Sequence, residues 1–278
     1  MSTKFRNLPT RLGVWLLLLL FCLGSLFPLY WTFLTSIKDR ADFFGFPPKF
    51  LFEPTLVNYH TVFEKSDFVR YLVNSTIVGL GSTLLAVVLG SMAGYALARS
   101  NVKNERSLMV WFLSMYMVPP LAVIVPYFLN YRFFGLYDTL HGLILAHASF
   151  NLPIVVWIMN SYFKKLSVEI EEAALVDGCS FPGAFRRITL PLSLPGIASA
   201  AVLAFIFSWN EFAFSKFLTS ETARTIPTGS AFWYSSKGID WGALSASGFL
   251  MIFPMILFVI VAQRGLIYGL SFGATSGD

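Results

Sequence analysis

Six long apolar runs divide this chain and restrict its fold more than any other feature. They cover residues 13–37, 72–98, 108–129, 140–163, 194–218 and 243–267. Each is near or above the roughly 20 residues that an α-helix needs to cross the hydrocarbon core of a bilayer. Inside lipid, the backbone must satisfy its hydrogen bonds within such helices. The sequence therefore predicts an all-α, polytopic membrane protein with six transmembrane helices.

The basic residues predict how the chain is oriented. Only 13% of its residues are charged, about half the share in soluble domains, and the net charge is +5. Lys and Arg gather on the cytoplasmic side of membrane proteins, so this excess need not mean nucleic acid, and we expect no such partner. The bias places both termini in the cytoplasm, with the first apolar run kept as a helix rather than cleaved as a signal. The basic residues that carry it are Lys4, Arg6, Arg11, Arg99, Lys103, Arg106, Lys164, Lys165, Arg186 and Arg187.

The residue pattern does not indicate catalysis by this chain. Cys22 and Cys179 lie in unlike surroundings and predict neither a disulfide nor a metal site. No phosphate-binding loop or HExxH pair occurs, so any ATP hydrolysis must come from a partner. The three histidines have no convincing catalytic partner in sequence, and we expect His147 to be a packing residue. An intramembrane enzyme and an ion channel are therefore the weaker alternatives.

The polar stretch 164–193, between the fourth and fifth runs, carries the most specific motif. It reads Glu172-Ala173-Ala174, three residues, Gly178, nine residues, Ile188, one residue, and Leu190-Pro191. The acidic start suits an exposed helix, and Gly178 permits a sharp bend or close approach. We expect this stretch to dock on another protein, since the alternative, a chance amphipathic connector, leaves the full motif unexplained.

The stretch resembles the EAA loop of ABC importer permeases. Further matches indicate the carbohydrate-uptake branch of that family, on the side of the shorter six-span subunit of maltose systems. They are Phe46-Pro47-Pro48, Thr55-Leu56-Val57-Asn58-Tyr59, Asn74-Ser75, Gly94-Tyr95-Ala96-Leu97-Ala98-Arg99, Pro119-Pro120, Gly135-Leu136-Tyr137-Asp138-Thr139 and Trp209-Asn210-Glu211-Phe212. The resemblance implies a type I importer fold, forming one permease domain over residues 1–278, in a bacterial cytoplasmic membrane.

The resemblance also implies partners and a mechanism. It implies a second homologous permease, different from this one, two ATPase subunits that hold ATP and Mg, an extracytoplasmic binding protein and the surrounding lipid. The cytoplasmic loop would couple to the ATPase through Glu172, Ala173, Ala174, Asp177, Gly178, Ile188, Leu190 and Pro191. The cargo would be a sugar or oligosaccharide, and a non-sugar or anionic solute such as a sugar phosphate or uronate oligomer is the alternative. The chain itself would need no cofactor.

Polar residues inside the apolar runs are candidates for a translocation path, because such groups are costly in lipid. They are Tyr116, Asn130, Asn151, Trp209, Asn210 and Glu211. For Glu211, an ordinary interfacial carboxylate is an equal alternative. In the second run, small residues recur every four positions at Ser82, Ala86, Gly90, Gly94 and Ala98. Such a stripe predicts a close contact with another helix.

The external loop 219–242 combines polar and aromatic residues. Phe232, Trp233 and Tyr234 are expected to contact the binding protein, since aromatic rings give large contact area with little loss of rotamer freedom. Anchoring of the sixth helix at the membrane interface is the alternative.

Overall fold

The structure is a computed structural model that describes residues 8–100, 102–235 and 238–274. Lys4 and Arg6, used above for orientation, and Ser236 and Lys237 of the external loop lie outside the described residues. The chain separates into two compact units. The first holds the described residues up to Phe68 with Ser230–Phe253, and the second holds Val69–Gly229 with the described residues from Pro254 onward. Helix α13 contributes to both units, and a single domain over 1–278 stays a prediction.

The first unit is built from one long helix and several short elements. Its elements are α1 (Leu8–Ser36), η1 (Arg40–Asp42), α2 (Val57–Lys65), η3 (Ala231–Trp233), β1 (Tyr234–Ser235), β2 (Gly238–Ile239) and the start of α13 (Trp241–Ala274). β1 and β2 form a small antiparallel hairpin. Asn58 of α2 donates from Nδ2 to the carbonyls of Ser36, at 2.9 Å, and Lys38, at 2.8 Å. It thereby satisfies acceptors that the end of α1 leaves free.

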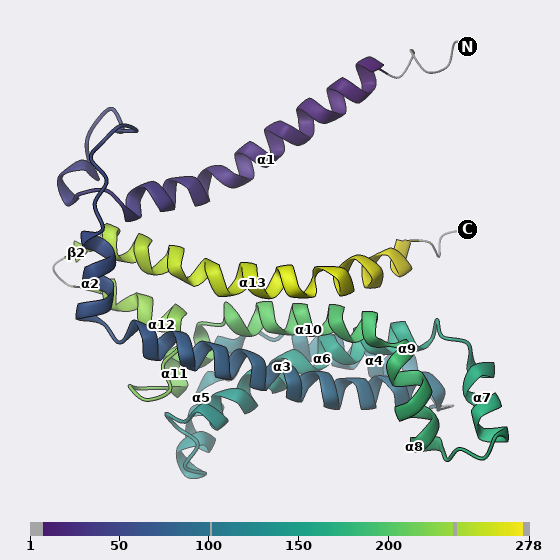
Figure 1. Cartoon of the computed structure of the whole chain (residues 1–278). Coiled ribbons are helices and arrows are strands. Elements are labelled where there is room, and N and C mark those ends of the chain that lie inside the picture. Colours follow the sequence, from purple (N-terminus) through teal and green to yellow (C-terminus); the bar gives the residue numbers. More distant parts are fainter. Residues whose placement is uncertain (1–7, 101, 236–237, 275–278) are drawn as a thin grey trace. The chain divides into compact units, whose positions relative to one another are not determined.

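The second unit is a bundle of helices, drawn in blue, teal and green in Figure 1. Its elements are α3 (Phe68–Arg99), α4 (Glu105–Tyr116), α5 (Pro120–Phe133), α6 (Leu140–Phe163), α7 (Val168–Val176), α8 (Phe181–Ala184), the π-helical turn η2 (Phe185–Thr189), α9 (Leu190–Leu192), α10 (Leu194–Trp209), α11 (Ala213–Leu218) and α12 (Ile226–Ser230). Helix α6 packs against both α4 and α10.

The described helices confirm a protein with several membrane-spanning segments. Helices α1, α3, α6 and α13 are each long and apolar enough to cross a bilayer. Two bent helix pairs, α4 with α5 and α8–α9 with α10, would bring the number to six. The fourth predicted run coincides with α6 over Leu140–Phe163.

The third apolar run, predicted as one segment over 108–129, is a bent pair of helices and not one straight helix. Helix α4 ends at Tyr116 and α5 begins at Pro120, with an angle of 83° between them. Pro119 precedes Pro120 in the sequence, and a residue before proline is pushed out of the helical region. Pro120 in turn suits the first position of a helix, where its missing N–H costs nothing.

The fifth run also ends earlier than the predicted Leu218. Helix α10 stops at Trp209, and α11 starts at Ala213. Glu211 lies in the break, and its carboxylate accepts the backbone N–H groups of Phe214, at 2.9 Å, and Ser215, at 3.1 Å. Because these N–H groups belong to the first turn of α11, Glu211 acts as the cap of a new helix.

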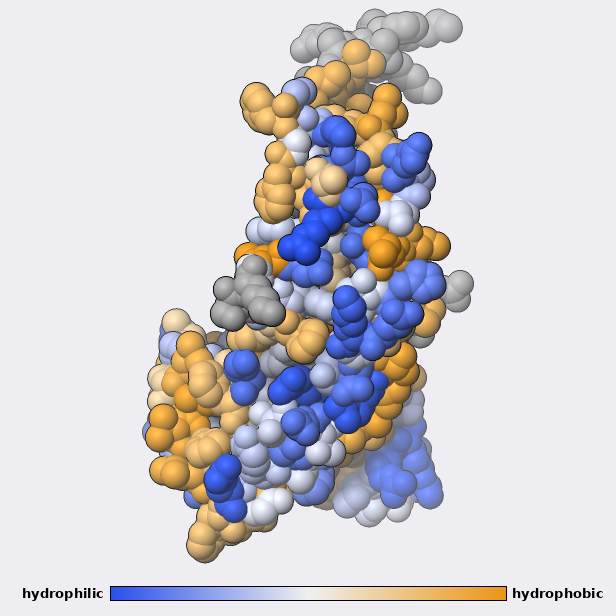
Figure 2. Space-filling view, turned by 90° about the vertical axis from the view of Figure 1, so that its left-hand side faces the viewer, coloured by the Kyte–Doolittle hydropathy of each residue, from blue (hydrophilic) through white to orange (hydrophobic). Residues whose placement is uncertain are grey.

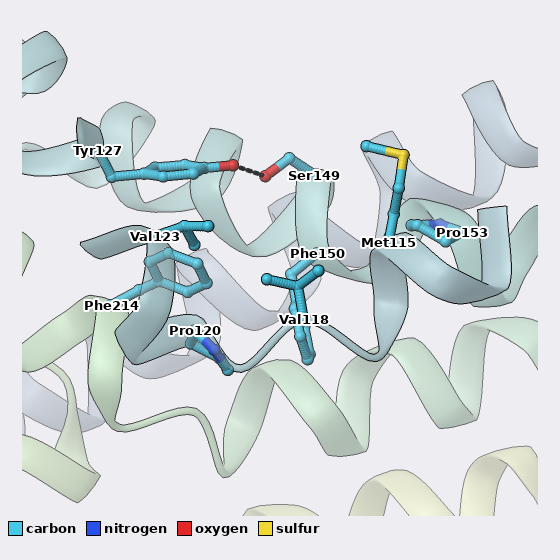
Figure 3. A pocket seen from close by; sticks show the side chains of 9 residues that line it. All are labelled: Met115, Val118, Pro120, Val123, Tyr127, Ser149, Phe150, Pro153 and Phe214. Atoms are coloured by element: carbon cyan, nitrogen blue, oxygen red, sulfur yellow. Dashed lines mark hydrogen bonds between the residues drawn. The ribbon is translucent and has the colours of Figure 1, made fainter. Parts of the chain in front are cut away.

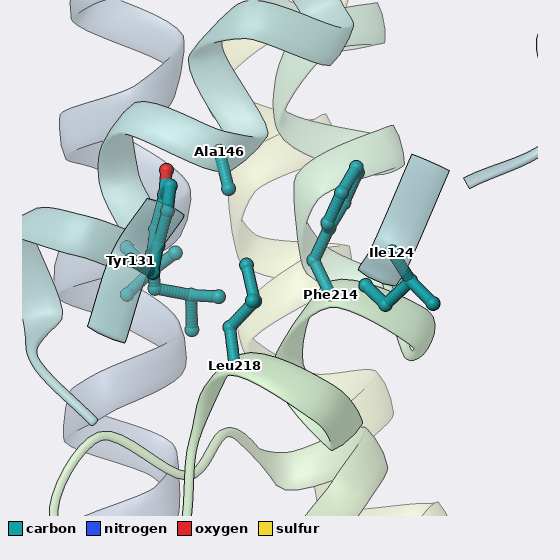
Figure 4. Packing of buried hydrophobic residues seen from close by; sticks show 7 residues of the cluster. Ile124, Tyr131, Ala146, Phe214 and Leu218 are labelled. Atoms are coloured by element: carbon teal, nitrogen blue, oxygen red, sulfur yellow. The ribbon is translucent and has the colours of Figure 1, made fainter. Parts of the chain in front are cut away.

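A buried apolar cluster joins α5, α6 and α11 in the second unit. Figure 4 shows Tyr131 and Ile124 of α5 close to Ala146 of α6 and to Phe214 and Leu218 of α11. Tyr131 also donates from its hydroxyl to the carbonyl of Gly142, at 3.0 Å. These contacts fix α5 and α11 against α6.

The small-residue stripe of α3 forms the close helix contact that the sequence predicts. A Cβ atom on Gly90 would lie 2.6 Å from Cγ1 of Val155, and one on Gly94 would lie 2.9 Å from the backbone nitrogen of Asn160. Both partners belong to α6. The two backbones therefore approach at a distance that only glycine permits.

We expect Gly90→Leu to destabilise the bundle, whereas Val88→Leu should be tolerated. Gly90 has no room for a side chain, while Val88 is 48% exposed on the same helix. Overpacking a tight contact costs about 1–3 kcal/mol. Thermal unfolding of the purified protein would measure the difference, and equal melting temperatures for the two variants would contradict the packing.

Candidate functional site

Helix α7, in the loop that carries the Glu-Ala-Ala motif, fixes itself to the bundle through Glu171. The Glu171 carboxylate accepts hydrogen bonds from Nη2 of Arg99, at 2.8 Å, and from the hydroxyl of Tyr95, at 2.8 Å. Burial alone would raise the pKa of this carboxyl, but the Arg99 and Tyr95 hydrogen bonds outweigh burial and hold the pKa below its ordinary value. Glu171 is therefore a structural anchor.

The motif residues next to Glu171 face outward. Glu172, Ala173, Asp177 and Gly178 are exposed, and Ala174 is buried against the bundle. Helical residues one position apart differ in direction by about 100°, which separates the buried Glu171 from the exposed Glu172. The outward surface also carries two apolar side chains, Val176 and Phe181, which are 88% and 72% exposed.

Gly178 ends helix α7 by a defined cap. Its φ is +91°, and its N–H donates to the carbonyl of Leu175, at 3.0 Å. The N–H of Cys179 donates to the carbonyl of Ala174, at 2.9 Å. This pair of bonds is a Schellman motif, which favours glycine at the left-handed position. Of the two roles expected for Gly178, the structure shows the bend, and nothing lies within 4 Å of its Cβ position.

The second half of the motif lies where the chain returns to the bundle. Ile188 and Leu190 are half-buried, and Pro191 is exposed. Phe185, just before them, packs on Tyr95 with ring centroids 4.5 Å apart. The motif thus forms one surface beside α7, held on the end of α3 by Tyr95 and Arg99.

At the opposite end of the bundle, Asp138 holds the start of the external loop. Its carboxylate accepts the backbone N–H groups of four consecutive residues: Ser220, Glu221, Thr222 and Ala223, at 2.9–3.2 Å. Burial raises the pKa of Asp138, but these four hydrogen bonds outweigh it and leave the pKa below its ordinary value. Sequence analysis quoted Asp138 only as part of a motif and missed this role, because its partners lie more than 80 residues away.

Helix α3 also forms hydrogen bonds with the external loop. Asn74 donates from Nδ2 to the carbonyls of Thr222 and Arg224, both at 2.9 Å. The hydroxyl of Ser75 accepts the N–H of Ile226, at 2.9 Å. The Asn74-Ser75 pair therefore fixes residues 222–226.

Among the predicted path residues, Glu211 is buried and paired. Its Oε2 lies 3.3 Å from Nε2 of His147, and both side chains are less than 10% exposed. The other ring nitrogen of His147 lies 2.7 Å from the hydroxyl of Ser208, which accepts a hydrogen bond from Ser82. His147 thus links α3, α6 and α10 through buried polar contacts, and its role as a packing residue stays a prediction.

The remaining path candidates are not brought together by any contact that the structure describes. Asn151 is buried and donates to the carbonyl of Ala204, at 3.1 Å, and Trp209 is also buried. Asn130 and Asn210 are exposed, and each donates to a carbonyl of its own helix. Tyr116 packs on the ring of Phe150, with centroids 5.2 Å apart. Their assignment to a path stays a prediction.

A pocket of about 230 Å³ lies at the break between α4 and α5. Figure 3 shows Phe150, Phe214 and Tyr127 around it, with the Tyr127 hydroxyl 2.9 Å from that of Ser149. Its described lining residues include no charged side chain. The lining is mainly apolar, with the hydroxyl groups of Tyr127 and Ser149 as its polar side-chain groups.

The three aromatic residues of the external loop differ in exposure. Phe232 and Tyr234 are 53% and 57% exposed, whereas Trp233 is buried. Figure 2 shows hydrophilic and hydrophobic residues side by side on the protein surface. Phe232 and Tyr234 are therefore available for a contact in the described structure, and Trp233 is not.

Comparison with known proteins gives the family. Residues 86–266 match the binding-protein-dependent transport system inner membrane component family. The chain belongs to this family. A relative, the trehalose transport system permease protein SugB of Mycobacterium tuberculosis, is 35% identical, over 91% of this chain and 93% of that protein. The trehalose/maltose transport system permease protein MalG of Thermococcus litoralis is 32% identical, over 94% and 95%.

A solved structure confirms the fold. A bacterial ABC transporter involved in the import of the acidic polysaccharide alginate superposes with a TM-score of 0.76 at 21% identity, covering 95% of this chain and 99% of that one. The inner membrane component described here is thus an ABC importer permease with the type I fold. It is a membrane subunit rather than an enzyme, so the intramembrane-enzyme alternative was wrong.

We expect Asp138→Asn to loosen the external loop of this permease. The amide offers weaker acceptors and places N–H groups against four N–H donors. A loss of about 1.5 kcal/mol, typical for one hydrogen bond to a charged group, would speed local exchange roughly tenfold. Hydrogen exchange at residues 220–223 would measure it, with Glu221→Gln, an exposed acid in the same loop, as control.

The same contact predicts an effect of pH. Because the pKa of Asp138 is lower in the folded state, its stabilising effect is fully present above the ordinary Asp pKa of about 3.9 and is lost as the pH falls through the folded value. Protection of these amides that does not change on acidification would contradict the assignment.

Proposed function

We propose that this permease carries a carbohydrate through the membrane, driven by ATP hydrolysis on partner subunits. The observation that carries the proposal is the exposed side of the motif on α7, formed by Glu172, Ala173, Asp177 and Gly178, in a chain of the importer family. The sugar follows from relatives more than 30% identical over almost their whole length, whose names give trehalose and maltose.

A neutral sugar is favoured over an anionic solute. The pocket in Figure 3 has rings and hydroxyl groups but no charged lining residue, and an anion would need a cationic group there. The structure related to alginate import supports the fold alone at its low identity. Tyr116, beside this pocket through Phe150, is the path candidate that we place nearest to the cargo.

The proposed assembly holds this chain, a second and different permease, two ATPase subunits with ATP and Mg, and an external binding protein. We propose that α7 and both termini face the cytoplasm, because Arg99, Lys103 and Arg106 gather on the side of α7. A cysteine at Lys103 should react with impermeant thiol reagents only from the cytoplasmic side, and one at Glu64 only from outside. The reverse labelling pattern would overturn this orientation.

Within this assembly, the α7 surface is proposed to couple to the ATPase. Glu172 and Asp177 supply negative charge, and Val176 and Phe181 supply apolar area beside them. Such a mixture of exposed apolar and charged groups suits a protein interface better than free water. The small side chains of Ala173 and Ala174 would let a partner approach the helix closely, and Gly178 ends the helix. The remaining motif residues lie next to this surface: Ile188, Leu190 and Pro191.

We expect Glu172→Lys to uncouple transport without unfolding the permease. Glu172 is exposed, so reversal of its charge disturbs only a docked partner. Truncating one partner of a buried interfacial charge pair costs about 2–5 kcal/mol, which corresponds to more than tenfold in affinity. ATP-driven uptake of labelled trehalose by vesicles, with retention of the ATPase, would be measured against Glu64→Lys. Normal trehalose uptake and normal retention of the ATPase in Glu172→Lys would refute the docking role. If the wild type retains the ATPase but does not take up trehalose, the cargo is another solute and the docking role stands.

We propose that Phe232 and Tyr234 contact the binding protein and that the buried Trp233 stabilises the loop that carries them. Replacing Phe232 and Tyr234 together by Ser should leave membrane insertion intact, because both are exposed. Stimulation of ATP hydrolysis by the loaded binding protein should fall severalfold. Trp233→Ser should instead lower thermal stability, since large buried aromatic residues contribute about 3–5 kcal/mol. Normal stimulation in the double variant would leave only the membrane-anchor alternative.

A further inference from the structure

A second cavity lies entirely within the first unit. Its volume is about 240 Å³, well above the roughly 30 Å³ that one water occupies in the liquid. It lies between the end of α1, the turn that follows it and the start of α13. The lining residues that matter here are Trp31, Thr35, Lys38, Phe43, Trp241 and Ser245.

Lys38 is the unusual member of this cavity. It is only 2% exposed, although lysine is among the residues that are almost never fully buried unless they are paired. Its Nζ lies 4.6 Å from the ring centroid of Trp31 and 5.0 Å from that of Phe52. These ring faces attract the ammonium but do not neutralise its charge.

Three acids of the first unit, Asp39, Asp42 and Asp240, have other partners. Asp39 accepts the N–H of Ala41, at 3.1 Å. Asp42 pairs with Lys49, at 2.5 Å, and Asp240 accepts the N–H of Ala243, at 3.1 Å, at the start of α13. Within the described part of the chain, no carboxylate forms an ion pair with Lys38. A buried ammonium beside an open cavity therefore lacks the anion that would balance it.

The position of the cavity indicates where this anion would come from. Helix α1 ends and α13 begins here, and both are long and apolar enough to cross a bilayer. The ends of such helices lie at the depth of the lipid headgroups, where Trp side chains gather, and Trp31 and Trp241 line the cavity. At that depth the most abundant anion is the phosphate group of a lipid.

We propose that this cavity binds the phosphate group of an anionic membrane lipid, with the Lys38 ammonium as its counter-charge. The hydroxyl of Ser245 also lines the cavity, and the two Trp rings would flank the apolar part of the ligand. The site belongs to the first unit alone and does not depend on which solute the permease carries.

The test uses the whole transporter complex, extracted and stripped of lipid, and titrated with phosphatidylglycerol or phosphatidylcholine while native mass spectrometry counts bound lipid. Lys38→Gln should lower the affinity for phosphatidylglycerol about tenfold, as expected for loss of a charge-assisted contact. Lys65→Gln, which removes an exposed lysine from α2 of the same unit, should leave it unchanged. Lys38→Arg should retain most of the binding.

Inorganic phosphate separates the two sources of the anion. If phosphate alone raises the melting temperature of the wild type but not of Lys38→Gln, while phosphatidylglycerol binds both equally, free phosphate is the ligand and the lipid proposal is overturned. Equal lipid binding and no phosphate effect in either protein would overturn the site altogether. If Lys38→Gln does not assemble, Ser245→Phe fills the cavity, leaves the charge in place and should abolish the same binding.

Discussion

The close approach of α3 to α6 is the contact on which the second unit depends. Between helices in lipid there is little hydrophobic driving force, so van der Waals contact and hydrogen bonds must hold the bundle. Gly90 and Gly94 bring the α3 backbone onto α6. On another side of α6, Asn151 donates to a carbonyl of α10, and His147 contacts Ser208. Helix α6 is therefore held by close backbone contacts and by hydrogen bonds, neither of which lipid chains can provide.

Helix α3 also connects the two ends of the bundle. Near one end, Tyr95 and Arg99 hold Glu171 of α7, and near the other, Asn74 and Ser75 hold residues 222–226. From Ser75 to Tyr95 the helix covers about 30 Å at ~1.5 Å per residue. One helix therefore contacts both the α7 loop and residues 222–226.

The sequence predicts the long helices well because hydropathy over 20 residues reports burial in lipid. It misses the break at Glu211, because a hydropathy window averages over single residues that end or start a helix, whereas Pro119-Pro120 marks the break between α4 and α5. The two prolines did carry a readable signal for a helix start. The candidate site was likewise predicted only in part. Local spacing identifies the α7 motif, but it cannot tell that Glu171 anchors while Glu172 is free, nor that Asp138 binds residues 220–223.

The exposed surface of α7 and α8 explains why this loop is so short and so firmly held. Val176 and Phe181 stand almost fully exposed next to Glu172 and Asp177, an arrangement that costs solubility unless a partner covers it. A flexible loop would bury these side chains against itself. The Arg99–Glu171 pair and the Gly178 cap prevent that by fixing both the base and the end of α7. A surface held open in this way needs no reordering before it meets a partner, which would lower the entropy cost of the docking proposed above.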